Sequence, residues 1–354
     1  MPIIAVSNQK GGVGKTTSTL NLGAALQGAG KRVLLVDLDP QGNLSVAAGL
    51  LQPEALSPSI GDLLVQAARP GAGIPNARAA IVRSPAGLDI IPANSQLSAA
   101  ELALVSAISR ESALHTVLLP LLPDYDFVLM DCLPSLSLLV VNAFTAADGI
   151  IIPVQADYLA MQGLAQVMET IAAVQTRLNP QLQIFGILLT MVDQRTSHSR
   201  EVVSTIRQAF ADQIRVFDAE IRLHVVLKDS TKAGLSIREY DPQSAGAIAY
   251  DRLAAELIEF VDSRGPTTPR NQRAAAAAVV LPSFTPPPPT PPAPLSAPAP
   301  EAEAPVATLS PEAPPIAEPV PEPPVARSRT TRTEPLRFAE FLAGRDGWLG
   351  RGDQ

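Results

Sequence analysis

The sequence predicts an α/β fold of the doubly wound kind, with a mostly parallel β-sheet and helices on both of its faces. Short runs composed almost entirely of Ile, Val and Leu alternate with longer stretches of helical character. Strands that are apolar without alternation are typical of a parallel sheet that is covered on both faces. A repeated order of strand and then helix favours the doubly wound arrangement. Because 46% of the 354 residues are apolar, a sizeable core can be buried.

The predicted elements occupy about the first 260 residues. The expected strands are Ile3–Ser7, Val33–Leu38, Leu88–Ile91, Phe127–Met130, Ile150–Val154 and Ile184–Thr190. The expected helices are Thr16–Gly28, Ser98–Leu119, Gln162–Leu178, Arg200–Phe210 and Gly246–Val261. We find no internal repeat, and we therefore expect one α/β domain over residues 1–262.

The composition changes after this domain. Residues 263–330 are rich in Pro and Ala, with four consecutive prolines at Pro286–Pro289. Such a segment cannot bury a core and prefers extended polyproline conformations, so we expect a semi-stiff disordered linker. In residues 331–354 the apolar side chains of Leu336–Leu342 fall at helical spacing, and Trp348 follows. This tail is either a short partner-docking helix or a disordered end.

Charge and cysteine content narrow the class of protein. A formal net charge of -7 argues against a chain coated with nucleic-acid-binding charge, although it leaves room for a local basic patch. The single cysteine, Cys132, excludes an internal disulfide framework and fits a reducing cytoplasm. There is no signal-peptide pattern and no apolar run near the roughly 20 residues that span a bilayer. We expect a soluble cytoplasmic protein that does not associate with membranes.

A glycine-rich loop joins the first strand to the first helix. The expected nucleotide-binding residues are Gly11, Gly12, Val13, Gly14, Lys15, Thr16 and Thr17. Glycines allow consecutive backbone N–H groups to turn toward phosphate oxygens, and the following helix adds the partial positive charge of its N-terminus. Lys15 is expected to reach the β- and γ-phosphates, and the Thr16 hydroxyl to bind Mg²⁺. The strict P-loop pattern has Gly where this chain has Gln9, and Lys10 is an additional feature.

The loop with its extra lysine resembles the deviant Walker A motif of the ParA/MinD family of ATPases. Several stretches of residues 1–260 resemble the chromosome- and plasmid-partitioning, Soj-like ParA branch of that family. The resemblance implies a P-loop NTPase fold and ATP held between two subunits, so that ATP binding drives formation of a homodimer. It also implies that Lys10 is the signature lysine, which reaches the phosphates bound by the partner subunit.

Acidic residues follow two of the predicted strands. Asp37 and Asp39 end the second strand, and Asp131 ends the fourth. The carboxyl ends of parallel strands face the ligand crevice. The resemblance implies that Asp39 orients the attacking water and that Asp37 lies near Mg²⁺. Asp131 has the Walker B arrangement, in which the carboxylate holds Mg²⁺ through its water shell.

The residues after Asp131 depart from the family pattern. The family usually continues Asp-Cys-Pro-Pro, whereas this chain has Leu133 in place of the first proline. The change puts in doubt the switch that couples hydrolysis to dimer release. We expect Cys132 to be a buried neighbour of the site rather than a nucleophile, because no adjacent base suggests thiol chemistry.

Two further regions carry expected contacts. The sixth strand ends at Thr190 and Met191, which the resemblance places beside the adenine base; the alternative is an ordinary strand end. In residues 194–273 basic residues are about as frequent as acidic ones, whereas acidic residues predominate before them. These basic residues are the expected surface for non-specific DNA. However, the family often has arginines where this chain has Leu223 and Val226, so Arg222, Lys228 or Lys232 would have to replace them.

We therefore expect a slow, Mg²⁺-dependent ATPase (ATP and water to ADP and phosphate) that acts as a switch. The leading hypothesis is partitioning of a chromosome or plasmid, or positioning of another cargo, through ATP-gated DNA binding and a ParB-like stimulating partner. A first alternative is a MinD-like ATPase on membranes, which would need a lysine-rich amphipathic C-terminal helix. A second is an adaptor that acts mainly through its proline-rich arm and is regulated by the ATPase.

Overall fold

The computed structural model describes residues 1–264, apart from residues 70, 72, 158–159 and 211–212. The predicted linker from residue 265 onward and the predicted tail, residues 331–354, lie outside the described residues.

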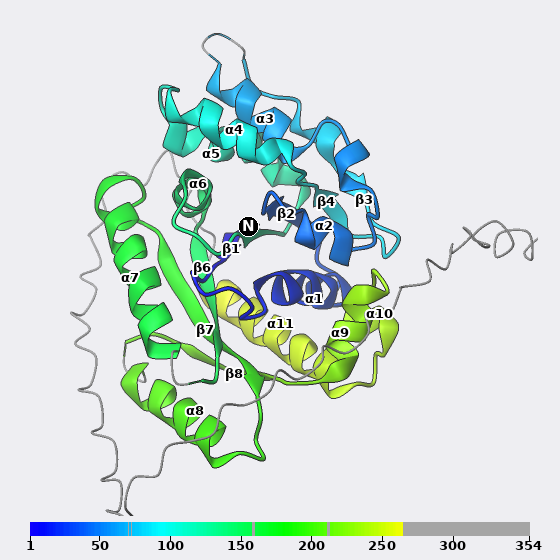
Figure 1. Cartoon of the computed structure of the whole chain (residues 1–354), viewed down its shortest axis with the longest axis vertical. Helices are drawn as coiled ribbons and strands as arrows, with labels where there is room; N and C mark the ends of the chain where they lie inside the picture. Colours follow the sequence, from blue (N-terminus) through cyan, green and yellow to red (C-terminus); the bar gives the residue numbers. More distant parts are fainter. Residues whose placement is uncertain (70, 72, 158–159, 211–212, 265–354) are drawn as a thin grey trace, which may run out of the picture. The chain divides into compact units, whose positions relative to one another are not determined.

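The described part of the chain is built on an eight-stranded sheet with the order β3-β4-β2-β5-β1-β6-β7-β8 (Figure 1). The strands are β1 (Ile3–Val6), β2 (Val33–Leu38), β3 (Val82–Arg83), β4 (Asp89–Ile91), β5 (Phe127–Cys132), β6 (Gly149–Gln155), β7 (Gln183–Val192) and β8 (Val216–Arg222). Adjacent strands pair in parallel, except that β3 is antiparallel to β4. The predicted doubly wound fold is confirmed.

All of the predicted strands are present, and the edge strands β3 and β8 are additional. Strand β3 is two residues long and only partly covered, so it lacks an apolar run. Strand β8 alternates buried residues such as Phe217, Ala219 and Ile221 with more exposed ones. Alternation of this kind is expected where one face of an edge strand meets solvent. A search for continuous apolar runs therefore misses both edges.

Helices precede or follow nearly every strand. They are α1 (Lys15–Gly28), α2 (Asn43–Ala47), α3 (Ile60–Ala68), α4 (Gln96–Val105), α5 (Ala113–Leu118), α6 (Leu138–Ala146), α7 (Ala160–Arg177), α8 (Ser197–Phe210), α9 (Val225–Lys232), α10 (Ile237–Tyr240) and α11 (Ala245–Ser263). Short 3₁₀ turns lie at Pro53–Ala55, Ala77–Ala80, Arg110–Ser112 and Leu119–Asp124. None of the helices in the described ranges is both long enough and apolar enough to cross a bilayer.

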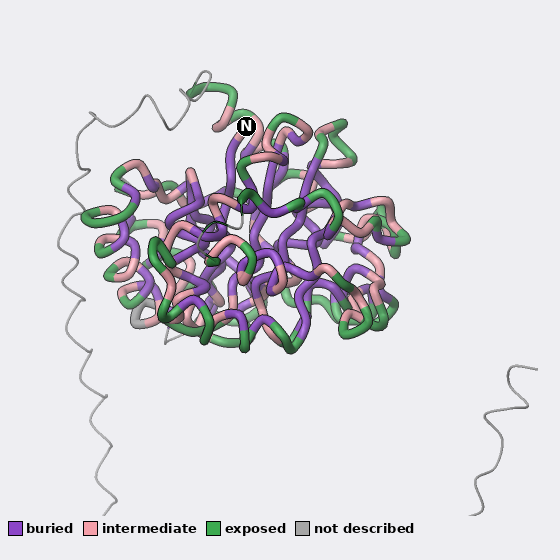
Figure 2. The backbone as a smooth tube through the Cα atoms, turned by 90° about the horizontal axis from the view of Figure 1, so that it is seen from above, coloured by how far each residue is buried: buried purple, intermediate pink, exposed green. Residues whose placement is uncertain are grey.

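The two faces of the sheet carry separate hydrophobic cores. Successive residues of β1 point to opposite faces: Ile3 and Ala5 belong to one core and Ile4 to the other. Helices α3 to α8 cover the first face, and α1, α2, α9, α10 and α11 cover the second (Figure 1). Figure 2 shows the buried residues gathered in the interior and the exposed ones toward the outside. Burial on both sides explains why the central strands are apolar throughout.

The single helix predicted over Ser98–Leu119 is wrong, because the chain forms α4 and α5 with a turn between them. Ser109 has φ 55°, which interrupts the helical path. The buried side chain of Asn142 on α6 holds this turn: its Nδ2 donates to the Arg110 carbonyl (2.8 Å), and its Oδ1 accepts from the Leu114 N–H (3.1 Å). The break thus depends on a distant side chain rather than on local helix breakers.

Helix α1 and strand β2 pack unusually closely, which fixes the direction of α1 as it leaves the glycine-rich loop. A Cβ atom on Gly23 would lie 2.7 Å from a methyl carbon of Leu35. Only glycine fits without displacing that buried side chain. The N-terminus of α1 lies at the carboxyl end of β5, since Thr16 Oγ1 contacts Asp131.

Candidate nucleotide-binding site

The loop between β1 and α1 has the backbone shape of a phosphate cradle. Gly12 (φ 75°) and Gly14 (φ 86°) adopt left-handed conformations that other residues rarely adopt. A Cβ atom added to Gly11 or Gly12 would meet no atom within 4 Å, so the space in front of these residues is open. The loop can therefore accept a group that approaches its backbone closely, as phosphate binding requires.

Lys15 lies at the inner end of the loop and is 7% exposed. Its Nζ donates to the carbonyl of Lys10 at 3.0 Å, so the ammonium bends back across the loop. Burial lowers the pKa of the Lys15 ammonium, and the nearby carboxylate of Asp131 opposes part of that shift. A buried cation at this position is ready to meet an anionic ligand in the loop.

The first turn of α1 contacts the end of β5 directly. Thr16 Oγ1 donates to Asp131 Oδ2 at 2.7 Å, and Thr19 Oγ1 lies 3.4 Å from Asp131 Oδ1. The predicted Mg²⁺ ligands Thr16 and Asp131 are thus brought together. Hydroxyl and carboxylate oxygens are ligands that Mg²⁺ prefers, usually with waters and substrate phosphates completing its shell.

Asp37 and Asp131 are paired residues of the neighbouring strands β2 and β5, and both are buried. Burial raises the pKa of each carboxyl group. The nearby charge of Asp37 raises the pKa of Asp131 further. The Ser45 hydroxyl and N–H both donate to Asp37 Oδ2, at 2.7 and 2.9 Å. Two buried acids side by side are a donor set that fits a divalent cation.

The described residues contain no cluster of three or more His, Cys, Asp or Glu side chains that could enclose a metal by themselves. In nucleotide sites, however, Mg²⁺ is usually bound by one or two protein carboxylates, and the phosphates provide further ligands. Thr16, Asp37 and Asp131 therefore fit Mg²⁺ that arrives with a nucleotide.

Asp39 lies at the rim of the same edge. Its Oδ1 accepts from the Gln41 N–H at 2.9 Å, and its Oδ2 accepts from Asn43 Nδ2 at 3.1 Å. These contacts belong to the turn from β2 into α2, and they fix the carboxylate while leaving it half-buried. Asp39 can therefore face a group that occupies the space outside the loop.

Lys10 begins the loop, and its side chain contacts the segment after β6. Its ammonium forms an ion pair with Asp157, which follows β6, and the two side chains are 28% and 31% exposed. The Lys10 N–H donates to Asn8 Oδ1 at 3.0 Å, and Asn8 Nδ2 donates to the Pro153 carbonyl at 2.7 Å. Sequence reasoning found Lys10 but missed Asn8 and Asp157, which lie far from each other in the chain.

Gln9, where the strict P-loop pattern has Gly, binds the loop to α7. Its Nε2 lies 3.2 Å from the Gln166 carbonyl and 3.2 Å from Thr170 Oγ1. A glycine could make neither contact. The departure from the strict pattern therefore gives the outer part of the loop an anchor on a neighbouring helix.

A cavity of about 270 Å³ lies next to the loop, on the side of α9 and α11. Its lining is mostly apolar and comprises Gly14, Thr17, Ser18, Thr190, Met191, Ile221, Arg222, Leu223, His224, Leu227, Lys228, Thr231 and Tyr250. The predicted base-side residues Thr190 and Met191 thus share a cavity with the loop. Thr190 Oγ1 also donates to the buried Val13 carbonyl at 2.9 Å.

Most of this cavity wall was not predicted. Leu227 belongs to α9, and Tyr250 belongs to α11, where its hydroxyl lies 3.2 Å from Ser18 Oγ. Met191 has φ 52°, an uncommon conformation for a residue with a side chain, and it turns the chain at the end of β7. The positive φ of Met191 could not be predicted from the spacing of apolar residues.

Cys132 is buried beside the acids, and burial raises the pKa of its thiol. Because the thiolate is the nucleophilic form, such a cysteine is inert. The geometry agrees with the expectation that Cys132 is a packed neighbour of the site.

The predicted basic residues divide into two groups. Arg195, Arg207 and Arg238 form ion pairs with Asp193, Glu220 and Asp251, respectively. By contrast, Arg222, Lys228 and Lys232 are exposed at the end of β8 and on α9. None of these three forms an ion pair with another residue in the described part of the chain.

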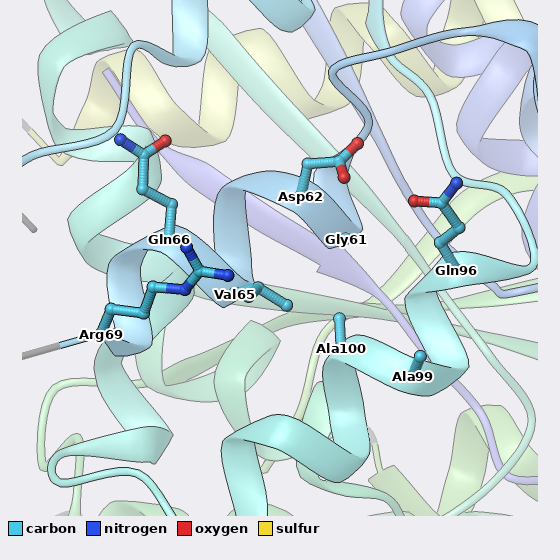
Figure 3. Close-up of a pocket in the computed structure, with 8 residues that line it drawn as sticks. All are labelled: Gly61, Asp62, Val65, Gln66, Arg69, Gln96, Ala99 and Ala100. Carbon is cyan, nitrogen blue, oxygen red and sulfur yellow. The ribbon is translucent and has the colours of Figure 1, made fainter.

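A larger cavity of about 720 Å³ lies elsewhere, between α3 and α4 (Figure 3). Its lining shares no residue with the loop, and α4 contributes Ala99 and Ala100. The carboxylate of Asp62 accepts from both the N–H and the hydroxyl of Ser59, so it is used as a helix cap. This cavity lacks the convergent charged groups of the loop region.

Comparisons with known proteins agree with the geometry. A family model described as an AAA domain matches residues 1–184. The chain is 44% identical over 255 residues to the sporulation initiation inhibitor protein Soj of Bacillus subtilis, which covers 72% of this chain and 97% of that protein. It is 42% identical over 258 residues to the chromosome partitioning protein ParA of Caulobacter vibrioides, which covers 72% of this chain and 93% of that protein.

A similar solved structure is named cobyrinic acid a,c-diamide synthase, from Mycobacterium smegmatis, and contains an ATP analogue and magnesium. It is 38% identical, has a TM-score of 0.64, and covers 75% of this chain and 97% of that chain. Together, the doubly wound sheet and its glycine-rich loop define a P-loop ATPase fold. The chain belongs to the ParA/MinD family of ATPases, in the Soj-like partitioning branch. The resemblance found in the sequence is thereby confirmed.

Proposed function

We propose that this chain is an ATP-dependent dimerising switch, in which residues 1–262 bind ATP and Mg²⁺ and two copies close around the nucleotide. The observation that carries the proposal is the meeting of Thr16, Asp37 and Asp131 behind an open phosphate cradle. This donor set suits Mg²⁺ held jointly with phosphates. The ATP analogue and magnesium in the similar mycobacterial structure support the same ligands.

Two lysines have different tasks in this proposal. Lys15 is buried at the inner end of the loop and binds the phosphates of its own subunit. Lys10 is partly exposed, and in this proposal its side chain leaves Asp157 to reach the phosphates of a second copy. A cation contributed by the second chain offsets triphosphate charge only when both chains are present. Binding of ATP therefore favours the dimer, whereas loss of the γ-phosphate favours separation.

Hydrolysis proceeds by attack of water on the γ-phosphate. Asp39 orients this water from its fixed position at the rim. Lys15 and Lys10 stabilise charge on the transferring phosphoryl group, and bound Mg²⁺ would supply further neutralisation there. Because a carboxylate is a weak general base near neutral pH, we expect slow turnover. Slow turnover suits a timer rather than a metabolic enzyme.

The base of the nucleotide occupies the cavity beside Gly14, in this proposal. Thr190 and Met191 form one wall, and the side chains of Leu227 and Tyr250 form others. A mostly apolar cavity of about 270 Å³ with a few polar groups is suitable for a purine.

The output of the switch is non-specific DNA binding that depends on ATP. Arg222, Lys228 and Lys232 are exposed and without ion-pair partners in the described ranges. A dimer doubles this set, so phosphate contacts accumulate in the ATP state. The relatives named for chromosome partitioning support a role in moving DNA or another cargo. We further propose that a ParB-like partner stimulates hydrolysis.

The test of the switch is the oligomeric state when hydrolysis is blocked. We expect the Asp39→Ala variant to be a dimer with ATP and Mg²⁺ and a monomer with ADP, as measured by size-exclusion chromatography with light scattering. Adding Lys10→Ala or Lys15→Ala should abolish the dimer. Lys31→Ala is a control, because Lys31 lies before β2, at the opposite end of that strand from Asp39. A Lys10→Ala variant that dimerised normally would overturn the proposal.

A further inference from the structure

Lys10 is restrained within its own subunit at both its backbone and its side chain. The Asn8 amide bridges the Lys10 N–H and the Pro153 carbonyl on β6. The ammonium is paired with Asp157, just beyond the end of the same strand. Gly163 of α7 lies alongside, since a Cβ atom on it would be 3.8 Å from Lys10 Cβ. The side chain that the proposed function assigns to the partner's phosphates is therefore held against β6 and α7.

A second restraint connects Lys10 to the phosphate site of its own subunit. Lys15 Nζ donates to the Lys10 carbonyl at 3.0 Å. When phosphates bind in the loop, they compete for the Lys15 ammonium as a stronger, charged acceptor. Nucleotide binding thus removes the contact at the carbonyl, whereas the ion pair with Asp157 does not depend on Lys15. The contact between Lys15 and the Lys10 carbonyl and the ion pair between Lys10 and Asp157 are therefore released by different events.

We propose that Asp157 is a positioning residue for Lys10: it keeps the lysine in its own subunit until the phosphates bound by a second copy replace it as the counter-ion. The inference rests on the proposed function and adds a regulatory step to it. ATP binding in one subunit releases the Lys10 carbonyl from Lys15, and approach of the second subunit then replaces the Asp157 carboxylate by a triphosphate as the counter-ion of Lys10. A monomer with bound ATP therefore keeps Lys10 paired with Asp157 until it meets a second subunit that also carries ATP.

The size of the effect follows from the exposure of the pair. Both side chains are about one-third exposed, and ion pairs of this kind shift an equilibrium by roughly 1.4- to 5-fold. Each dimer breaks two such pairs. Neutralising Asp157 should therefore tighten ATP-dependent dimerisation by roughly 2- to 30-fold.

The experiment compares Asp157→Asn with its parent in the full-length chain carrying Asp39→Ala. The dimer dissociation constant is measured with ATP and Mg²⁺ by analytical ultracentrifugation, and the rate of Lys10 acylation without nucleotide is measured by mass spectrometry. We expect tighter dimerisation and faster Lys10 labelling, with Lys31 as the internal reference. Asp157→Glu retains the carboxylate and should behave like the parent.

A matched control removes the same charge from the same region. Glu169 lies on the exposed side of α7. The Glu169→Gln variant should change neither the dimer dissociation constant nor the rate of Lys10 labelling. Equal or weaker dimerisation of Asp157→Asn, or an equal gain in Glu169→Gln, would overturn the role of Asp157 and leave the switch itself standing. If the parent fails to dimerise with ATP, the proposed function itself falls.

Discussion

At the scale of residues, the site is built around two acids that the fold would be more stable without. Asp37 and Asp131 are neighbours in the centre of the sheet, and both are buried. Burial raises their pKa values to about 6 and about 8. Keeping two carboxyl groups there opposes folding at neutral pH unless a cation or protons compensate. The proposed Mg²⁺ site would account for their presence, whereas stability would not.

This arrangement predicts an inverse dependence of stability on pH for the nucleotide-free protein. Both acids ionise near pH 3.8 in the unfolded chain and at higher pH in the folded one. Between these values the folded state binds more protons, so the free energy of unfolding falls as the pH rises from about 4 to 8. We expect thermal denaturation in EDTA to show a melting temperature that decreases over this range.

The corresponding variant provides the control. Asp131→Asn removes one of the two charges, so it should flatten the pH dependence and raise the melting temperature at pH 8. It should also lose Mg²⁺-dependent hydrolysis, since Asp131 contacts Thr16 at the proposed metal position. An unchanged pH profile in this variant would show that other groups cause the dependence.

Thr190 gives a second prediction at this scale. Its hydroxyl donates to the Val13 carbonyl, and both residues are almost fully buried. Thr190→Val keeps the shape but leaves the carbonyl without this donor, which should lower the free energy of unfolding by about 1–3 kcal/mol. Urea denaturation measures the change, and the exposed Thr205→Val on α8 should stay within about 0.5 kcal/mol of wild type.

At the scale of elements, the central strands could be predicted because burial on both faces requires continuous apolar sequence. Helix α6 could not, since it is buried on nearly all sides and its apolar residues show no helical period. Helix α3 was overlooked although it has a readable signal: Ser59 and Asp62 form a capping box. Helix α6 was missed because its sequence has no helical period, whereas the signal for α3 was present in the sequence but was not used.

In the functional site, local features could be predicted from the sequence, whereas contacts between distant residues could not. The loop and the acids Asp37, Asp39 and Asp131 are local features, each adjacent to a strand, and could be read from the sequence. The pairing of Lys10 with Asp157 joins residues 147 positions apart, so no spacing rule predicts it. The cavity wall likewise needs β8, α9 and α11 to be placed in space before its residues can be named.

The end of β8 and α9 carry a prediction about DNA. Lys228→Ala combined with Lys232→Ala removes two exposed cations from each subunit. At saturating ATP, which offsets any loss at the base cavity that Lys228 lines, binding to arbitrary duplex DNA should weaken at every sequence, and the slope of log affinity against log salt should become shallower. Fluorescence anisotropy over a salt series measures both quantities.

A charge-matched control is available in the same region. Arg195 and Arg207 already form ion pairs with Asp193 and Glu220. Replacing both by Ala should change the salt slope less than the double lysine variant does. A larger effect in the arginine variant would move the DNA-binding surface away from α9.

At the scale of the whole domain, the two helical layers meet the proposed nucleotide site at one edge of a shared sheet. α1 packs on one face, and α6 and α7 pack on the other. The loop continues directly into α1 at Lys15, and its residue Gln9 contacts Gln166 of α7. A ligand in the loop therefore contacts elements of both layers.

Nucleotide binding should consequently stabilise the domain as a unit. At a free ATP concentration of about 100 times the dissociation constant, the free energy of unfolding should rise by about 2.7 kcal/mol, with Mg²⁺ present. Differential scanning calorimetry on Asp39→Ala measures the shift without hydrolysis. Lys15→Ala should show little shift, whereas a full shift in that variant would place the nucleotide elsewhere.

The position of β1 has a consequence for the order of events during synthesis. β1 precedes β5 and β6 in the chain and leaves the ribosome before them, yet it lies between them in the sheet. The loop after it cannot gain its contact with Asp131 until more than a hundred further residues have emerged, and Tyr250 completes the neighbouring cavity later still. A nascent chain therefore carries the whole loop sequence for most of translation while lacking the partners that would let it retain nucleotide.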